Sequence, residues 1–245
     1  KLRDIHSSRD ILIYVHGYNY SFEESLFQFA RIVTEGGLTE APILFSWPSE
    51  GAITGYVADK EAAVYARDDL VDLLSGLKKQ NPKSHVTLFG HSMGAWIVVE
   101  SLRQLKLSKR NDVLRWMGRV VLAAPDIDID LFKRQIETIG PLAHPMIVLN
   151  SRDDRALAIS RRVGGFRVRM GSIDTDDAIA QEMIAQRAIQ VIDLSMLPAP
   201  DGTNHNRFIK LVGVLSRSNQ RRKTFLENGF HDALFHVGIT KGSID

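Results

Sequence analysis

Residues 85–95 read HVTLFGHSMGA, and this stretch decides how the chain around it can fold. Its first half is a β-branched and apolar run, which predicts a buried strand. A helical pattern begins at Ser92 and continues to about Leu107. The apolar positions on one face of that helix are Ala95, Val98, Leu102 and Leu105. A buried strand that passes directly into a helix is the building unit of a layered α/β protein.

The same alternation of short apolar runs and longer helical patterns extends along the chain. Most of the runs are uninterrupted, as in strands that are buried on both faces of a parallel sheet. The expected strands are residues 11–17, 42–47, 85–91, 119–125, 145–151 and 190–195. We therefore predict an α/β fold with a mostly parallel sheet, helices on both faces and a minimal cap, in a single domain over residues 1–245.

Helix signals lie between these strands. Ser21 begins the sequence SFEE, in which Glu24 is placed for a capping box, so a helix is expected from that point. Apolar residues at helical spacing predict further helices over 59–80 and 177–188. The tail after Phe208 has a mixed pattern and is also expected to be helical.

The composition is that of an ordinary globular protein. Of the 245 residues, 44% are hydrophobic and 24% are charged, which excludes wholesale disorder and fibrous architectures. The absence of cysteine excludes disulfides, thiolate catalysis and cysteine-based metal sites. No metal-binding or phosphate-binding motif is present, so we expect no metal and no cofactor. The charge balance of 31 basic to 29 acidic residues makes nucleic acid an improbable partner.

Two features bear on location and partners. The chain begins at Lys1 rather than at methionine, so an N-terminal signal or anchor segment ahead of it is an open expectation, and so is the compartment. No apolar run approaches the ~20 residues that cross a bilayer. Basic clusters allow membrane association, although such clusters are more often a solvated face. They comprise Arg161, Arg162, Arg167 and Arg169, and later Arg217, Arg221, Arg222 and Lys223.

The pentapeptide Gly90-His91-Ser92-Met93-Gly94 fits the pattern GxSxG of a nucleophile elbow. Such an elbow requires a strand before it, a helix after it, and small residues around a serine held in a strained conformation. Ser92 would then be the nucleophile, and the Met93 N–H at the helix N-terminus would face an oxyanion. The alternative is an ordinary glycine-rich turn with Ser92 as the N-cap.

A second oxyanion donor is expected at the end of the first strand. Gly17 allows a sharp turn there, which directs the Tyr18 N–H to the same oxygen, while His16 is expected to hold the turn. Trp47 leaves the second strand at the same edge of the sheet. It either walls an acyl pocket or simply packs at that edge.

The base and the acid should follow Ser92 in the order acid, then histidine. His205 lies in a polar loop after the last expected strand, where the base belongs. His144 precedes a strand, at the wrong edge of the sheet, and His231 and His236 are fallbacks in the C-terminal tail. Asp154 is the preferred acid, and the alternatives are its neighbour Asp153 and, after the preceding strand, Asp126.

Taken together, these residues resemble a largely bacterial, functionally undefined branch of the α/β-hydrolases, whose members are esterase-like or lipase-like. The matching stretches are YVHGYN, SFEES, LFSWPSEG, DKEAA, GHSMG, LAAPDID, DDRALAIS and the loop with His205, spread from about Asp10 to His205. The resemblance implies the α/β-hydrolase fold and the triad Ser92, Asp154 and His205. It selects Asp154 because the family's acid stands two residues before Ala-Leu.

The expected function is hydrolysis of small carboxylic esters through a Ser92 acyl-enzyme. An acyltransferase or thioesterase using the same triad is an alternative, and so is a binding module that has kept the fold. Only residues 126–144 separate two of the strands, which makes a large lid at that point improbable, while residues 155–189 could cover the cleft. The oligomeric state stays open.

Overall fold

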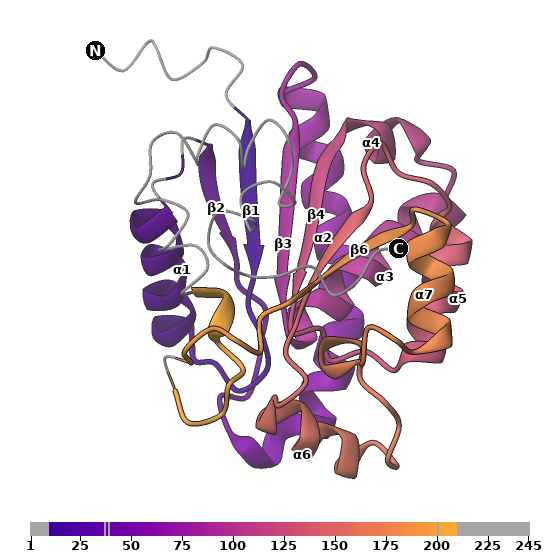
Figure 1. Ribbon diagram of the computed structural model, residues 1–245. Helices are drawn as coiled ribbons and strands as arrows, with labels where there is room; N and C mark the ends of the chain where they lie inside the picture. The colour runs from indigo at the N-terminus through magenta and orange to yellow at the C-terminus, as the bar shows by residue number, and fades with distance from the viewer. Residues whose placement is uncertain (1–9, 37, 39, 200, 210–245) are drawn as a thin grey trace.

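The computed structural model describes residues 10–36, 38, 40–199 and 201–209, and it shows one six-stranded sheet between layers of helices (Figure 1). The strand order is β2-β1-β3-β4-β5-β6, and every neighbouring pair is parallel. The strands are β1 (Ile11–Val15), β2 (Ala41–Phe45), β3 (Val86–His91), β4 (Met117–Ala123), β5 (Met146–Asn150) and β6 (Ile189–Asp193). The predicted α/β fold with a parallel sheet is confirmed.

Helices cover both faces of the sheet. They are α1 (Phe22–Gly36), α2 (Tyr56–Gln80), α3 (Met93–Leu107), α4 (Asn111–Trp116), α5 (Ile129–Ile139), α6 (Arg155–Val163) and α7 (Ala178–Ala185), with short 3-10 turns η2 (Ile53–Gly55) and η3 (Met170–Ser172). Helix α1 packs on one face, whereas α2, α3, α5 and α7 pack on the other (Figure 1). None of the helices in the described ranges is both long and apolar enough to cross a membrane.

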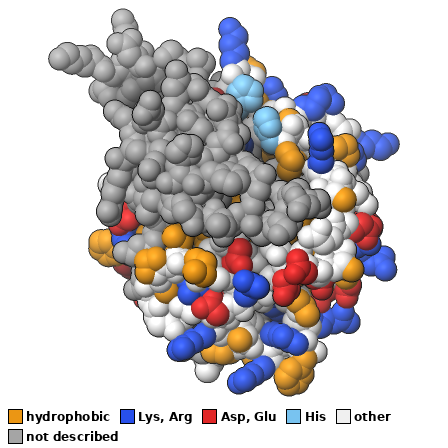
Figure 2. Space-filling model, in the orientation of Figure 1, with side chains coloured by type: hydrophobic (Ala, Val, Ile, Leu, Met, Phe, Trp, Pro, Cys, Tyr) orange, Lys and Arg blue, Asp and Glu red, His pale blue; other side chains and the backbone are white. Residues whose placement is uncertain are grey.

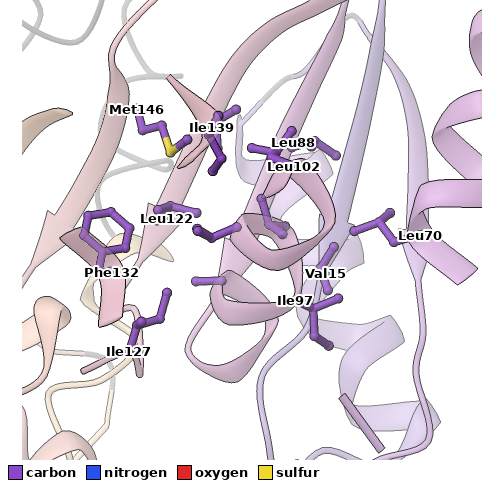
Figure 3. Close-up of a cluster of buried hydrophobic side chains, with 14 of the residues drawn as sticks. Val15, Leu70, Leu88, Ile97, Leu102, Leu122, Ile127, Phe132, Ile139 and Met146 are labelled. Atoms are coloured by element: carbon purple, nitrogen blue, oxygen red, sulfur yellow. The ribbon is translucent and has the colours of Figure 1, made fainter. Parts of the chain in front are cut away.

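The strand residues divide between two cores because successive side chains point to opposite faces of a sheet. In β1, Ile13 and Val15 face the helices α2 and α3, while Tyr14 faces α1. The larger core joins Leu88 and Leu122 of the central strands to apolar side chains of the covering helices (Figure 3). These central strands are buried on both faces, which explains their uninterrupted apolar sequences.

The predicted capping box at the start of α1 is present. The Ser21 hydroxyl accepts from the Glu24 N–H at 3.2 Å, and the Glu24 carboxylate accepts from the Ser21 N–H at 2.9 Å. The helix expected over 59–80 begins slightly earlier, and the one expected over 177–188 is shorter, because Asp177 caps it at one end and it ends at Ala185.

Helices α4 and α6 were absent from the sequence prediction, and α5 was not predicted from periodicity. Helix α5 begins where Asp128 accepts from the Leu131 N–H at 3.0 Å, and α6 begins where Asp154 accepts from the Leu157 N–H at 2.9 Å. The tail after Phe208, for which the sequence predicts a helix, lies outside the described residues apart from Ile209. His231, His236 and the later basic cluster Arg217, Arg221, Arg222 and Lys223 also lie outside the described residues.

Candidate active site

Ser92 forms the sharp bend between β3 and α3. Its backbone has φ 54° and ψ −119°, in a region that costs a non-glycine residue about 1–3 kcal/mol. Its N–H donates to the Ala123 carbonyl at 2.9 Å, and its carbonyl accepts from the N–H groups of Ala95 and Asp126 at 3.1 and 3.2 Å. The side chain makes no N-cap hydrogen bond to α3. The bend is therefore held by backbone contacts, which leaves the hydroxyl uncommitted to capping.

Close packing around the bend leaves no room for a side chain at Gly90 or Gly94 and little room at Gly17. A methyl group on Gly94 would overlap the carbonyl oxygens of Val15 and His16. A methyl group on Gly17 would lie 3.0 Å from the Ser92 Cβ atom. The end of β1 and the turn after it are thus packed directly against the serine, where the second oxyanion donor was predicted.

His205 and Asp154 are in direct contact. The Nδ1 atom of His205 lies 2.7 Å from Oδ2 of Asp154, while the other oxygen of Asp154 caps α6. Asp154 is buried, and its position at the end of β5 places it at the carboxyl edge of the sheet. Burial lowers the pKa of the His205 imidazole, but the Asp154 charge and hydrogen bond outweigh burial, so this pKa is raised above 6.5.

Ser92 and His205 are linked in this structure through His91, which precedes Ser92 in the chain and contacts His205. Within the described part of the chain, the two side chains are not bonded to each other. The ring of His91, the residue before Ser92, lies 4.7 Å from the His205 ring, measured between centroids. Contacts of this kind commonly tighten only when substrate is bound.

The loop that carries His205 is clamped by Arg207 and Asp153. Both terminal nitrogens of Arg207 bond the Asp153 carboxylate, one of them at 2.9 Å. The Asn204 side chain also donates to Asp153 at 2.9 Å. The two candidate acids, Asp153 and Asp154, therefore have different partners. Asp154 bonds the His205 imidazole, whereas Asp153 bonds Asn204 and Arg207, which flank His205 in the sequence.

Asp126 is engaged elsewhere. Its carboxylate accepts from Tyr56 at 2.9 Å and from Ser160 at 2.5 Å, and it lies 3.2 Å from Nε of Arg169. Asp126 and Arg169 are both 3% exposed. Asp126 is bonded within this buried cluster and not to His205. Its placement therefore does not support it as the alternative acid.

The chain is similar to a family of α/β hydrolases along most of its length. Residues 2–222 match the family described as "Alpha/beta hydrolase of unknown function (DUF900)". The chain belongs to this family. An uncharacterized protein, alr1448, from Nostoc sp. is 27% identical over 122 residues. That match covers 40% of this chain and 32% of the Nostoc protein, so the chain spans less than half of this curated relative.

Solved structures similar to this α/β hydrolase include two esterases. The catalytic core of acetyl xylan esterase from Trichoderma reesei is 10% identical, with a TM-score of 0.48, and the alignment covers 89% of this chain and 99% of that one. An esterase of Pyrococcus furiosus is 15% identical, with a TM-score of 0.48 and coverage of 89% and 82%.

In this α/β hydrolase, His16 and Trp47 lock the turn after β1. Their rings stack at 5.3 Å between centroids, the Trp47 N–H donates to Nε2 of His16 at 3.1 Å, and the indole N–H donates to the His16 carbonyl at 2.8 Å. Trp47 is only 4% exposed. The structure therefore supports edge packing for Trp47 rather than the predicted acyl-pocket wall, and His16 holds the turn as expected.

His91 is the feature of the site that sequence reasoning did not single out. Its side chain is fully buried between the rings of His205 and Phe208, and neither ring nitrogen has a hydrogen-bond partner within the described ranges. Burial lowers the pKa of His91 well below 6.5, and His205 lowers it further. The alternation of side chains along β3 could have placed it on the His205 face.

Three other observations complete the comparison with the predicted site. His144 is exposed before β5, at the opposite edge of the sheet from His205. Met93 begins α3, so its N–H lies at the helix N-terminus beside Ser92. Among the described residues, no group of three or more His, Asp or Glu side chains is arranged to hold a metal ion.

Proposed function

We propose that this α/β hydrolase cleaves carboxylic esters through an acyl-enzyme formed on Ser92. The observation that carries the proposal is the 2.7 Å contact between His205 and the buried Asp154, at the edge where Ser92 forms its strained bend. A carboxylate in this position orients the imidazole and stabilises its protonated form. A strained serine and a carboxylate-bound imidazole at the same edge of the sheet supply the nucleophile and the base that acyl transfer needs.

The proposed reaction has two halves. The Ser92 oxygen attacks the ester carbonyl carbon while Nε2 of His205 takes the hydroxyl proton. The N–H groups of Met93 and Tyr18 donate to the oxyanion that forms. When the C–O bond breaks, the leaving alkoxide takes the proton from His205. Water then attacks the acyl-enzyme by the same route, releasing the carboxylic acid and restoring Ser92.

Esters are preferred over amides because an alkoxide leaves more readily than an amine. A thioester would react through the same steps, and an alcohol in place of water would make the protein an acyltransferase. The site therefore supports ester chemistry. Whether the acyl group passes to water or to an alcohol depends on which of them reaches the acyl-enzyme first.

The test uses a fluorophosphonate probe and a panel of nitrophenyl esters of different chain length. The wild-type protein should be labelled and should turn over at least the short-chain esters, whereas Ser92→Ala should lose both properties. Ser108→Ala, at the exposed C-terminal end of α3, is the matched control and should behave as wild type. A folded wild-type protein that neither labels nor turns over any ester would favour a binding module instead.

A further inference from the structure

The segment that follows the proposed acid forms a lobe at the carboxyl edge of the sheet. We call residues 155–168, which comprise α6 and the turn after it, the α6 lobe. Within the lobe only Leu157 and Ser160 are buried, and Ser160 is bonded to Asp126 and Tyr56. One side of the lobe is therefore held by the buried cluster around Asp126, and its outer side is exposed.

Large apolar side chains lie on that outer side. Ile159 and Val163 are one helical turn apart and each is 59% exposed, while Phe166 in the following turn is 70% exposed. A single exposed apolar residue needs no explanation, but a contiguous group of them usually marks an interaction site.

The outer side is also strongly basic. The lobe contains no acidic residue, and it has four arginines, Arg155, Arg161, Arg162 and Arg167. Of these, only Arg167 forms an ion pair within the described part of the chain, at 3.6 Å from Asp130 and 3.8 Å from Asp128. The lobe thus presents cations and apolar side chains together.

Other exposed apolar residues lie at the same edge. Phe22 begins α1, Val57 is the second residue of α2, and Met196 follows β6, so each comes soon after the carboxyl end of a strand. In Figure 1 the α6 lobe is at the lower end of the molecule, and in Figure 2 that end shows basic and hydrophobic side chains next to one another. The edge with the candidate active site therefore carries further exposed apolar groups beside those of the lobe.

We propose that the α6 lobe docks on an anionic lipid surface and turns the active-site edge toward the membrane. Cations alone would suit any polyanion, but exposed Phe166 and Ile159 would also gain free energy from an apolar phase beside the negative charge. A bilayer interface of anionic lipids offers both within a few ångströms. The substrates would then be esters that reside in or near a membrane. This statement about substrates rests on the proposed function.

The test is co-sedimentation of the full chain with phosphatidylcholine vesicles that contain or lack phosphatidylglycerol. We expect binding only to the anionic vesicles, and a loss of affinity of about 5-fold for each arginine removed in Arg161→Gln/Arg162→Gln. Phe166→Ser should lower the affinity about 10-fold. Lys79→Gln/Lys83→Gln, an equal charge change on exposed residues at the opposite edge, is the matched control and should bind as wild type.

Three outcomes would overturn the proposal: equal binding to both kinds of vesicle or to neither, an equal loss in the control pair, or a loss in the arginine pair with none in Phe166→Ser. The last outcome would indicate a site for a soluble polyanion. Fluorophosphonate labelling without vesicles should proceed at the wild-type rate in every lobe variant. Lipid binding without labelling would support the docking surface and refute the proposed esterase. Labelling without lipid binding would support the proposed esterase and refute the docking surface.

Discussion

At the scale of single residues, the two oxygens of Asp154 have separate tasks. One bonds the imidazole of His205 at 2.7 Å, and the other caps α6 by accepting from Leu157 at 2.9 Å. Asparagine keeps an oxygen for the cap but has no charge. The variant Asp154→Asn therefore isolates the electrostatic part of the contact from its part in building the helix.

We expect Asp154→Asn to lower kcat on the order of 10⁴-fold, if the cost matches that of a comparable triad. The acidic limb of the pH–rate profile should also move to lower pH, because the Asp154 charge raises the pKa of His205, whose neutral form is the base. Asp126→Asn should leave kcat far less affected, since Asp126 bonds Tyr56, Ser160 and Arg169 instead. Equal and mild losses in both variants would contradict the proposed acid.

The candidate residues differ in how visible they are in the sequence. Ser92 has a motif, and Asp154 and His205 each follow a strand in the order that the motif requires. The sequence left two roles open for Trp47, a pocket wall and edge packing, because its burial depends on the His16 ring, 31 positions away along the chain. Stacking partners so distant in sequence leave no local pattern.

At the scale of elements, the His205 loop owes its placement to the clamp between Arg207 and Asp153. The clamp brackets the imidazole between Asn204 and Arg207, both of which bond the same carboxylate. A fork-shaped guanidinium can hold both oxygens of a carboxylate, and a lysine cannot.

We expect Arg207→Lys to loosen this loop without unfolding the protein. The free energy of unfolding should fall by about 1 kcal/mol because the Asp153 side chain is half exposed. Ester turnover should fall more steeply, by up to about 10²-fold, because a small displacement of the base is costly. Chemical denaturation and steady-state kinetics measure the two effects. Arg152→Lys, at the exposed ion pair with Asp193, is the control and should change neither.

The strands could be predicted to within a few residues because buried parallel strands carry uninterrupted apolar runs. Helix α6 could not be found by periodicity, since it buries only Leu157 and Ser160 and docks through a polar cluster. Helix α5 has an apolar face at Ile129, Phe132, Ile136 and Ile139.

At the scale of the whole molecule, we expect three buried or partly buried histidines near the site, His16, His91 and His205, to contribute to the response to acid. Burial lowers the pKa of His16 and of His91, although hydrogen bonds partly offset the effect at His16. Their contribution to stability is complete above 6.5 and is lost as the pH falls below that value, because the unfolded chain then binds protons first. His205, whose pKa is raised, contributes in the opposite direction.

The free energy of unfolding should therefore fall as the pH is lowered from 6.5 toward about 5. His91→Phe, which keeps a ring between His205 and Phe208, should flatten this decline, and urea titrations at several pH values measure it. His144→Phe on the surface is the matched control and should reproduce the wild-type slope. An unchanged slope in His91→Phe would show that the decline has another source.

The turn at Gly164 and Gly165 has an evolutionary consequence. Gly165 has φ 75°, is exposed, and has nothing within 4 Å of where a side chain would begin. Chain insertions are tolerated best at such tips. New sequence acquired there would lengthen the chain beyond α6 while Asp154 kept its bond to His205, so descendants of this scaffold could remodel the surroundings of the candidate site without rebuilding it.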